Sequence, residues 1–597
     1  MRYPVVLALM FAALSASSYG QNPPPEQPEI SSEEAPVTFS SRVNLVSVPV
    51  VVRDRQGRAI GNLKQEDFQL FDKGKAQVIT KFSVEKTEGA ATAAQTTVPR
   101  EPIQPSVAAV KPTLPERYVA YLIDDIHLKP ADLLNARQAM HRHLDESLDP
   151  DSRAAMFTTS GLVLTDFTSD REKLHQAINT VKPWTGPTDS ALDCPPTSYY
   201  LADLLTNRYL FFSGVLFSDQ QLAGMTSPAE LVAFLAEAAG AGCPIPQAPP
   251  PGAQVSGNQP GSFAWEGRQT IRRVLILGDH ETDLTLGALK DIVRRLIVMP
   301  GSRSLVLVSP GFMVNRDHRS AEADVLERAI RANVTVNTID MRGLYTTIPG
   351  GDASTRGNTG MFGGILQQVE NDAASDASNV LEEFADGTGG SFFHNDNDLK
   401  GGLNQLAAKP EYLYVLGFSP QNLKYEGSFH ALKVAVRGVP GATLQLRKGY
   451  WAPSHAIDSA EAAQEEISDA VFSRDEIHDL PIDLQTEFFK ASDDKAELTV
   501  VARVDGSGLR FRTAGDRNND KVTVIAGLFD SNGNYVSGIQ KVVTLHLRNQ
   551  TLDALRNSGI VLKEVFNIAP GRYVVRLVVR DSEGKAMAAI NGGVEIP

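Results

Sequence analysis

The sequence predicts an α/β protein with a doubly wound, mostly parallel sheet that is flanked by all-β units. The first observation is that apolar strands alternate with helical segments between residues 117 and 410, which favours a sheet covered on both faces. The second is that short strands with turn signals follow, and residues 480–597 have the pattern of a β-sandwich. At 597 residues the chain is too long for one core, so several domains are expected.

The amino-terminal residues 1–20 resemble a secretory signal peptide. Arg2 supplies the positive charge, residues 5–14 are apolar, and small residues precede Gln21. The apolar stretch is shorter than the roughly 20 residues that span a bilayer. We therefore expect cleavage, a secreted, periplasmic or extracellular mature protein, and no membrane span after signal removal. An uncleaved anchor is the alternative.

Three segments precede the α/β region. Residues 21–36 are rich in Pro, Glu and Ser and are expected to be a disordered spacer. Residues 37–85 contain the β-rich runs 43–52 and 78–84 and are expected to form a small β unit. Residues 86–116 return to Ala, Thr and Pro, the composition of a linker.

Within residues 117–410 each element follows from its hydrophobic period. Short apolar runs predict strands at 118–124, 154–158, 161–167 as an edge strand, 304–309, 334–340 and 391–394. Apolar residues at helical spacing predict helices at 130–147, 170–181, 266–277, 284–298, 321–332, 377–385 and 399–408. A long insertion, residues 185–262, interrupts the alternation and contains one further expected helix, 228–239.

The remaining segments are mainly β. Residues 411–453 contain three expected strands, and this segment and the amino-terminal β unit each have too few strands for a stable core, so the two are candidates for one sandwich. Residues 454–479 are charged and helical in pattern and are expected to be a linker. The carboxyl-terminal sandwich, 480–597, has strands expected at 496–504, 521–529, 541–547, 561–568, 572–580 and 587–596.

The two cysteines, Cys194 and Cys243, both lie in the long insertion. An even number of cysteines in a chain expected to be exported favours a disulfide between them. The alternative is two unpaired buried thiols, because the separation of their Cα atoms does not follow from sequence.

Charge and motifs exclude several functions. The formal net charge of -14 argues against a nucleic-acid partner. Nucleophile-elbow, zinc-protease and phosphate-loop motifs are missing from the sequence, so hydrolase and nucleotidase activities have no motif to support them. His141 and His143 are two residues apart on an expected helix, which indicates a solvated surface. Residues 516–520 and 530–534 have calcium-like spacing, but hairpin turns are favoured.

A strand that ends at Asp124, the Val-Ser-Pro-Gly strand end at 308–311 and the run 384–390 before a short strand resemble a von Willebrand factor type A domain. More narrowly, the chain is similar to secreted type A-related proteins of the Acidobacteria type over roughly residues 40–453. The segments that carry this narrower resemblance are 54–63, Asp67 with Phe68, 122–127, 299–301, 307–312 and 447–450.

The resemblance implies a Mg²⁺ site built from Asp-x-Ser-x-Ser, a Thr and a second Asp. Here Asp124 matches the first position, whereas Ile126 and Leu128 stand at the two serine positions and Ser309 at the last aspartate. Three interpretations stay open. The surface binds partners without metal; or Asp124 and Asp125 hold Mg²⁺ or Ca²⁺ with a hydroxyl from Thr188, Thr197 or Ser198; or Asp124 caps the local turn and His127 only packs.

The sequence therefore predicts an exported, non-enzymatic interaction or adhesion protein without a cofactor, which binds protein or glycan partners at the cell envelope. The metal site of its type A-like domain is expected to be degenerate. The alternatives are metal-dependent adhesion through a rebuilt site at Asp124 and Asp125, a hydrolase whose site has no recognised motif, and a passive structural scaffold.

Overall fold

The computed structural model describes residues 28–35, 46–86, 115–148, 151–161, 164–184, 197–206, 263–344, 363–408, 410–420, 428–452, 459–473, 476–492 and 494–597. The expected signal peptide, the helix at 228–239, Thr188, and the disulfide between Cys194 and Cys243 lie outside the described residues.

A six-stranded sheet forms the centre of the α/β region. Its strands lie in the order β11-β10-β9-β6-β7-β8, and all neighbours are parallel except β7 and β8. This is the 3-2-1-4-5-6 order of doubly wound folds, with an antiparallel edge strand. The strands are β6 Arg117–Ile123, β7 Ser152–Thr158, β8 Leu164–Thr168, β9 Ser302–Ser309, β10 Val334–Asp340 and β11 Phe392–Phe393. All residues of β6 are buried, as a central parallel strand requires.

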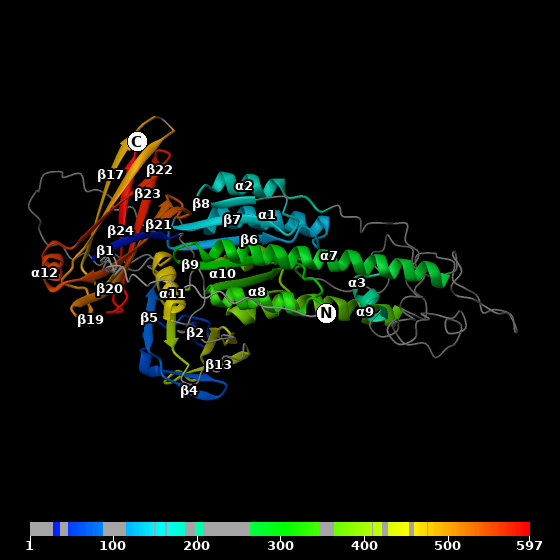
Figure 1. Ribbon diagram of the computed structural model, residues 1–597. Helices are drawn as coiled ribbons and strands as arrows, with labels where there is room; N and C mark the ends of the chain where they lie inside the picture. The colour runs from blue at the N-terminus through cyan, green and yellow to red at the C-terminus, as the bar shows by residue number, and fades with distance from the viewer. Residues whose placement is uncertain are drawn as a thin grey trace, which may run out of the picture.

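Helices cover both faces of this sheet. One face packs on α1 Pro130–Ser147, α2 Arg171–Thr180 and α10 Leu399–Ala407, and the other on α7 Phe263–Ile297, α8 Arg319–Arg331 and α9 Gly363–Thr388. Figure 1 shows α7 running past the ends of the strands toward α3, Tyr199–Leu205. Among the helices of the described residues, none is both long and apolar enough to cross a membrane.

Helix α7 differs from the sequence expectation of two helices at 266–277 and 284–298. It is one helix of 35 residues that continues through Gly278. A Cβ atom at Gly278 would lie 2.3 Å from the ring of Tyr199, so the glycine lets α3 approach the helix closely. The expectation of two helices was wrong because a glycine that serves close packing looks like a break in the sequence.

The amino-terminal β unit pairs with the strands after Pro410. One sheet has the order β14-β2-β12-β5 and the other β15-β13-β3-β4, so each contains strands from both segments. Val48, Val50, Leu70, Tyr414 and Phe418 lie in the core between them. The α/β region is therefore inserted between the two halves of one sandwich. The strands of this sandwich are β2 Val46–Arg53, β3 Phe68–Asp72, β4 Lys75–Gln77, β5 Lys81–Lys86, β12 Tyr412–Phe418, β13 Phe429–Val436, β14 Thr443–Leu446 and β15 Gly449–Trp451.

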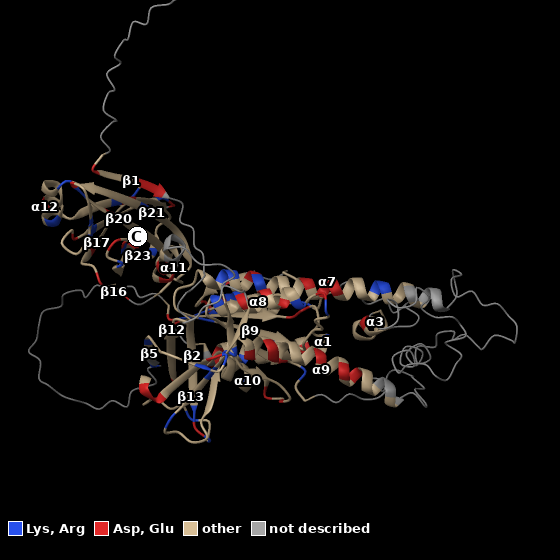
Figure 2. Cartoon of the chain, turned by 60° about the horizontal axis from the view of Figure 1, so that its bottom comes forward, with Lys and Arg blue, Asp and Glu red and all other residues tan. Residues whose placement is uncertain are grey.

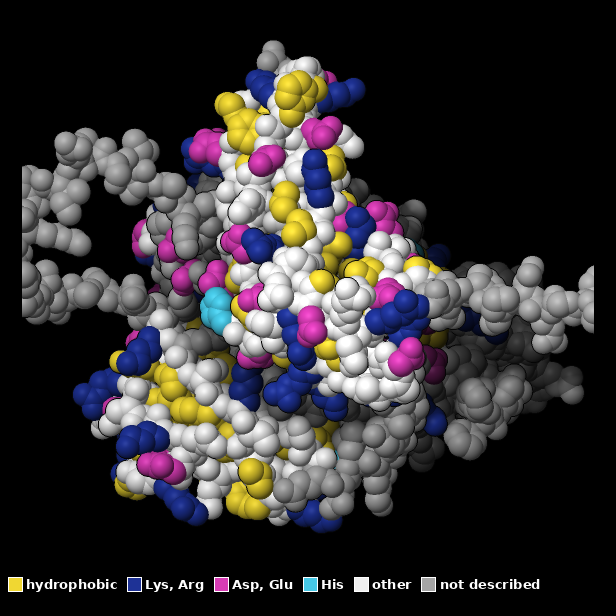
Figure 3. Space-filling model, turned by 60° about the vertical axis from the view of Figure 1, so that its left-hand side comes forward, with side chains coloured by type: hydrophobic (Ala, Val, Ile, Leu, Met, Phe, Trp, Pro, Cys, Tyr) yellow, Lys and Arg dark blue, Asp and Glu magenta, His cyan; other side chains and the backbone are white. Residues whose placement is uncertain are grey.

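The carboxyl-terminal region is a second sandwich. A seven-stranded sheet, β1-β21-β20-β23-β24-β16 with β19 beside β20, packs on the three-stranded sheet β17-β18-β22. Seen in Figure 3, hydrophobic side chains on this side of the molecule occur in small groups separated by charges of both signs. The elements are β1 Ile30–Ala35, α11 Ser459–Val471, β16 Ile477–His478, β17 Ile482–Lys490, β18 Ala496–Val504, β19 Arg512–Ala514, β20 Arg517–Asp530, β21 Tyr535–Leu547, α12 Asn549–Ser558, β22 Ile560–Ile568, β23 Gly571–Asp581 and β24 Met587–Ile596.

Two segments of this sandwich were expected to be spacers. Residues 30–35 form β1, which pairs antiparallel with β21 from Ile30 opposite Leu545 onward, so the expectation of disorder is wrong for them. Helix α11 buries Ile467 and Val471 against the seven-stranded sheet. It is thus part of the sandwich core rather than a linker.

The turn between β20 and β21 meets the amino ends of the central strands. Tyr118 donates its hydroxyl hydrogen to the carbonyl of Asn532 at 3.3 Å, and Asn534 Nδ2 donates to the carbonyl of Phe167 at 3.5 Å. Asp530 Oδ1 accepts from the backbone N–H groups of Asn532 and Asn534, both at 2.8 Å, which closes the turn. Residues 530–534 thus form the hairpin turn that the sequence favoured, and that turn connects the two domains.

Candidate functional site

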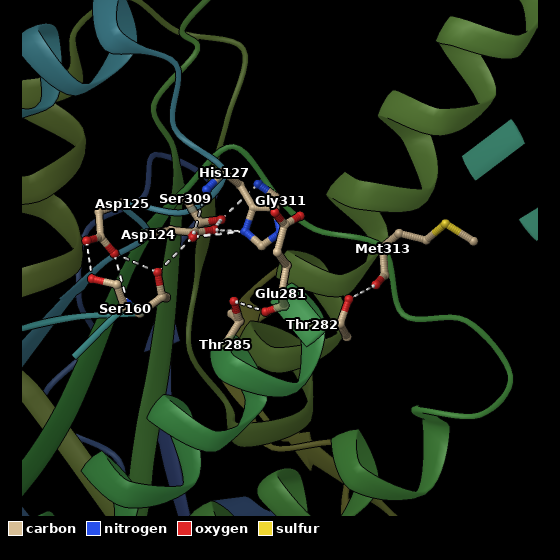
Figure 4. Close-up of polar contacts among 11 residues, drawn as sticks. Asp124, Asp125, His127, Ser160, Glu281, Thr282, Thr285, Ser309, Gly311 and Met313 are labelled. Atoms are coloured by element: carbon tan, nitrogen blue, oxygen red, sulfur yellow. Dashed lines mark hydrogen bonds and ion pairs between the residues drawn. The ribbon is translucent and has the colours of Figure 1, made fainter. Parts of the chain in front are cut away.

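The carboxyl ends of β6, β7 and β9 bring six polar residues together. We call this group the Asp124 corner: Asp124, Asp125 and His127 after β6, Thr159 and Ser160 after β7, and Ser309 at the end of β9. Parallel strands place these ends at one edge of the sheet, where doubly wound folds bind ligands. Figure 4 shows Asp124 between Ser309 and His127, and Asp125 turned toward Ser160.

Asp124 is fully buried and its carboxylate is saturated with hydrogen bonds. Oδ1 accepts from the Thr159 hydroxyl at 3.0 Å and from the His127 backbone N–H at 3.2 Å. Oδ2 accepts from the Ser309 hydroxyl at 2.6 Å, and Nδ1 of His127 lies 2.9 Å from both oxygens. A carboxylate offers about four lone-pair sites, and these four contacts occupy them, with the Thr159 hydrogen shared with Asp125.

Asp124 and His127 form a buried ion pair. Burial alone would raise the pKa of Asp124, but the charge and hydrogen bonds of His127, with the Ser309 hydroxyl, hold it below its usual value. Burial opposes protonation of His127, yet Asp124 raises its pKa, helped by the charges of Glu281 and Asp125. The ring also stacks on Phe312, with centroids 5.8 Å apart. His127 therefore acts as the internal cation of the corner.

Asp125 binds the neighbouring loop instead. Its Oδ1 accepts from the Thr159 hydroxyl at 2.9 Å and from the Ser160 backbone N–H at 3.0 Å, and its Oδ2 accepts from the Ser160 hydroxyl. Burial raises the pKa of Asp125, although these hydrogen bonds oppose the change. The side chain joins the end of β6 to the loop after β7, and the single hydroxyl hydrogen of Thr159 is shared between Oδ1 of Asp124 and Oδ1 of Asp125.

The corner does not fit the Mg²⁺ or Ca²⁺ ion that the family resemblance implies. Both ions require several oxygen ligands, but Leu128 is buried in the core beneath α1 and Ile126 has no oxygen in its side chain. Ser309 donates its hydroxyl hydrogen to Asp124, whose lone pairs are all in use. Across the described residues, no group of three or more His, Cys, Asp or Glu side chains is placed to hold a metal ion.

Thr197 and Ser198, whose hydroxyl groups the sequence offered as metal ligands, lie at the start of α3. Ser198 caps α3 by accepting from the backbone N–H of Leu201 at 3.2 Å. Thr197 precedes that cap, and its hydroxyl is buried without a hydrogen-bond partner in the structure. Tyr199 ties α3 to α7 through Asp279 at 2.6 Å. Neither Thr197 nor Ser198 forms a hydrogen bond with Asp124 or Asp125 in the structure.

Sequence reasoning missed Thr159 and Ser160, which complete the corner. No motif marks them, but they follow an expected strand directly, and that position could have identified them. His143, expected on a solvated surface, is instead 1% exposed and lies 2.6 Å from both the Tyr121 hydroxyl and Asn404 Oδ1. Burial lowers the pKa of His143.

A cavity of about 560 Å³ lies farther along the same edge, at the carboxyl ends of β10 and β11 beside α9. Arg342 forks onto Asp340 at 2.7 to 3.1 Å and donates to Ser378 at 3.0 Å. The rings of Phe392 and His394 are nearly parallel, with centroids 4.5 Å apart. Figure 2 shows acidic residues at several positions along α9. The lining residues, none of them Lys or Arg, are Asp340, Asn371, Ala374, Ser375, Ser378, Asn379, Glu382, Phe392, His394 and Asn395.

Neither a family model nor a curated protein matches the sequence. Among solved structures, an aerotolerance-related membrane protein from Bacteroides fragilis is 11% identical, with 48% of this chain and 97% of that chain covered and a TM-score of 0.20. The conserved hypothetical protein BatB from Bacteroides thetaiotaomicron is 12% identical, with 49% and 96% covered and a TM-score of 0.19. A glycosyl hydrolase family 2 member from Bacteroides cellulosilyticus is 11% identical, with 32% and 21% covered and a TM-score of 0.15.

These similarities are too low to support an argument about function. The fold instead rests on the strand order, which is in keeping with the type A-like domain that the motifs indicated. The chain is thus a mixed α/β and β-sandwich protein whose central sheet has the strand order of doubly wound folds, with an internal ion pair of Asp124 and His127 at the carboxyl edge of that sheet.

Proposed function

We propose that the protein is an exported, non-enzymatic interaction protein that binds a protein or glycan partner at the cell envelope through the carboxyl edge of its type A-like sheet. Binding needs no metal ion at Asp124. The observation that carries this proposal is the saturation of the Asp124 carboxylate by His127, Thr159 and Ser309.

A buried carboxylate requires a compensating positive charge, because desolvation of an isolated ion costs several kcal/mol. In a metal-bridged adhesion site, an ion supplies that charge and presents an open coordination position to the partner. Here His127 supplies it from within the chain, and the ion pair has no open position. The corner therefore supports the edge of the sheet, and partner contacts fall to side chains around it.

The cavity at β10 and β11 is the part of this edge best suited to those contacts. Its amide, hydroxyl and carboxylate groups, with one pair of stacked rings, match the mixture of polar and aromatic groups found in specific binding sites. Arg342 neutralises Asp340, so the lining offers hydrogen bonds more than positive charge. This favours a neutral or basic partner surface over an anionic one.

A hydrolase at the Asp124 corner is disfavoured by the order of its contacts. In a serine triad, the histidine ring lies between the serine hydroxyl and the carboxylate. Here Asp124 lies between the other two, since both the Ser309 hydroxyl and Nδ1 of His127 contact it. Ser309 therefore contacts a carboxylate that is already paired with His127, and it lacks the histidine base of a triad.

The test is quantitative affinity capture from envelope extract, with and without chelator, using the wild type and Asn379→Arg. Asn379 lies exposed on α9 in the cavity, so the arginine should block binding without unfolding the helix. Asn557→Arg, also exposed on a helix, is the matched control. We expect the same partners with and without chelator, retention by the control and loss with Asn379→Arg.

Other outcomes would contradict the proposal in distinct ways. Loss of partners on chelation would indicate metal-dependent adhesion. Failure to enrich any partner would indicate a passive scaffold. Turnover of peptide or ester substrates by the purified protein would indicate an enzyme.

A further inference from the structure

Two histidines face each other across the packed helices α1 and α2, which lie side by side in Figure 1. Nδ1 of His141 is 2.7 Å from Nδ1 of His175, and the ring planes are inclined by only 21°. A contact this short is one hydrogen bond long, so one of the two nitrogens must carry a proton or both must share another cation.

The outer nitrogens determine which atoms carry protons. Nε2 of His141 is 3.0 Å from Oδ1 of Asn179, and Nε2 of His175 is 3.0 Å from Oδ1 of Asp145. Both partners are oxygen acceptors, so each Nε2 carries a hydrogen. A neutral imidazole has only one N–H, which leaves both Nδ1 atoms with bare lone pairs pointing toward each other.

This arrangement has the pattern of a metal site. Histidine ligands of metals characteristically donate their second ring N–H to a carboxylate or another acceptor, which fixes the tautomer and the ring orientation. Asp145 and Asn179 provide such acceptors, one for each ring. A cation between the two Nδ1 atoms would convert the repulsion of the lone pairs into two bonds.

We propose that His141 and His175 bind a divalent transition-metal ion of the class that prefers imidazole, with Zn²⁺ as the representative. Imidazole nitrogen suits Zn²⁺, Ni²⁺ and Cu²⁺, whereas Mg²⁺ and Ca²⁺ prefer oxygen. Tetrahedral Zn²⁺ with bonds of 2.0–2.1 Å separates two nitrogens by about 3.3 Å, so the rings need to move apart by about 0.6 Å and tilt until both lone pairs meet at the ion.

The surroundings allow that adjustment. The side chain of His175 is 20% exposed and that of Asp145 is 64% exposed, so the ion can be reached from solvent. The site has two protein ligands, consistent with the lack of any larger group of ligating residues in the described parts of the chain, and water completes the coordination. The inference is independent of the proposed partner binding, because these helices cover a face of the sheet while the cavity lies at its edge.

Isothermal titration of the purified full-length protein with ZnCl₂, and separately with MgCl₂, tests the proposal. We expect one saturable Zn²⁺ per chain and no Mg²⁺ binding. His141→Ala and His175→Ala should each abolish Zn²⁺ binding, while His478→Ala, an exposed histidine in β16, should leave it unchanged. Asp145→Asn should weaken affinity 10-fold to 100-fold, the typical cost of losing such a supporting contact.

Nitrogen-15 NMR of the imidazole rings gives a second readout that does not depend on affinity. The proposal requires both rings to carry a hydrogen on Nε2, and Zn²⁺ to shift the two Nδ1 signals. A doubly protonated ring at neutral pH together with unchanged spectra on adding Zn²⁺ would overturn it, since a proton would then be the shared cation. Zn²⁺ binding that persists in both alanine variants would also overturn it.

Discussion

At the scale of single residues, Asp124 shows how a buried carboxylate is compensated by a neighbouring side chain. Its neighbours along the chain provide apolar Ile126 and Leu128 where oxygen ligands were expected, and the positive charge comes from His127 three residues on. A buried pair of this kind is sensitive to loss of one partner, because the remaining charge is left uncompensated.

We predict that His127→Gln destabilises the protein by about 3 kcal/mol at neutral pH. The glutamine retains some hydrogen bonding but leaves the Asp124 carboxylate without its cation. Urea unfolding measures the change. Asp124→Asn combined with His127→Gln should recover part of the loss, because two neutral amides need no charge compensation. A single variant as stable as wild type would contradict the ion pair.

The same pair predicts a pH dependence. Folding raises the pKa of His127. Its contribution to the free energy of unfolding is therefore complete below the unfolded-state pKa near 6.5 and is lost as pH rises through the folded-state pKa. Because folding lowers the pKa of Asp124, its contribution is present above the unfolded value of 3.8 and is lost as pH falls through the folded value. The free energy of unfolding of wild type should therefore fall as pH rises through the folded pKa of His127. The His127→Gln variant has no such group, so urea unfolding at several pH values should not show this fall.

Asp520 provides a second residue-scale prediction. Burial, and then the nearby charge of Asp581, raise the pKa of Asp520 to about 7. The folded state thus keeps a proton that the unfolded state releases near 3.8, so this stabilisation is present at low pH and is lost as pH rises through about 7. The melting temperature of Asp520→Asn should change less between pH 4 and 8 than that of wild type, and it should be higher than that of wild type at pH 8. Asp516→Asn, on the exposed hairpin, should keep the wild-type profile.

The sequence located Asp124 but not its chemistry. The mismatch with the metal motif is readable from Ile126, Leu128 and Ser309. The contacts of Thr159 and Ser160 depend on how β7 lies beside β6, and a single sequence does not contain that distance. The pairing of His141 with His175 was missed for the same reason, since it joins two different helices.

At the scale of elements, the loop after β9 depends on one glycine. Gly311 has φ +91°, and a Cβ atom there would lie 2.3 Å from the carbonyl oxygen of Ala377 in α9. Its backbone N–H donates to the Ser309 hydroxyl at 2.9 Å, so the loop conformation also supports the Asp124 corner.

We predict that Gly311→Ala destabilises the protein by more than the about 1–3 kcal/mol typical of a strained backbone conformation. The matched control is Gly438→Ala, which has φ +80° but no atom within 4 Å of the added Cβ, so it reports backbone strain alone. Thermal or urea unfolding of the two variants separates strain from steric clash. Equal losses would show that the contact with Ala377 is unimportant.

Most elements with a clear hydrophobic period were recognisable from sequence. The strands β6 and β9 are continuous apolar runs and α1 begins at Pro130 after an extended residue, so local physics specifies them. Strand β1 has the composition of a disordered spacer and becomes a strand only by pairing with the edge of β21. The pairing joins segments that are far apart in the sequence, so it cannot be predicted from the few residues of β1 alone.

At the scale of the whole molecule, the segment that contains β1 completes a sheet formed by the other end of the chain. We predict that deletion of residues 21–35 leaves the edge of β21 unprotected, because its pairs from Ile30 opposite Leu545 to Ala35 opposite Gln540 are lost. Hydrogen exchange should become faster at residues 540–545, and the sandwich should melt at a lower temperature. Deletion of residues 21–27 alone is the control. Unchanged exchange at β21 would contradict the pairing.

The split sandwich also determines when the molecule can fold during synthesis. Strand β2 borders β12 and β14, so it leaves the ribosome long before either neighbour exists, and β1 waits longer still for β21. Domains usually fold in the order in which they are made, amino-terminal first. Here β3 can pair early with β4, but β1 and β2 remain without their partner strands until the α/β region has been translated, and β2 is an apolar segment that stays unpaired throughout that interval. The pairing of β2 and β1 is therefore completed only after the strands that follow the α/β region, and for β1 those of the carboxyl-terminal sandwich, have been made.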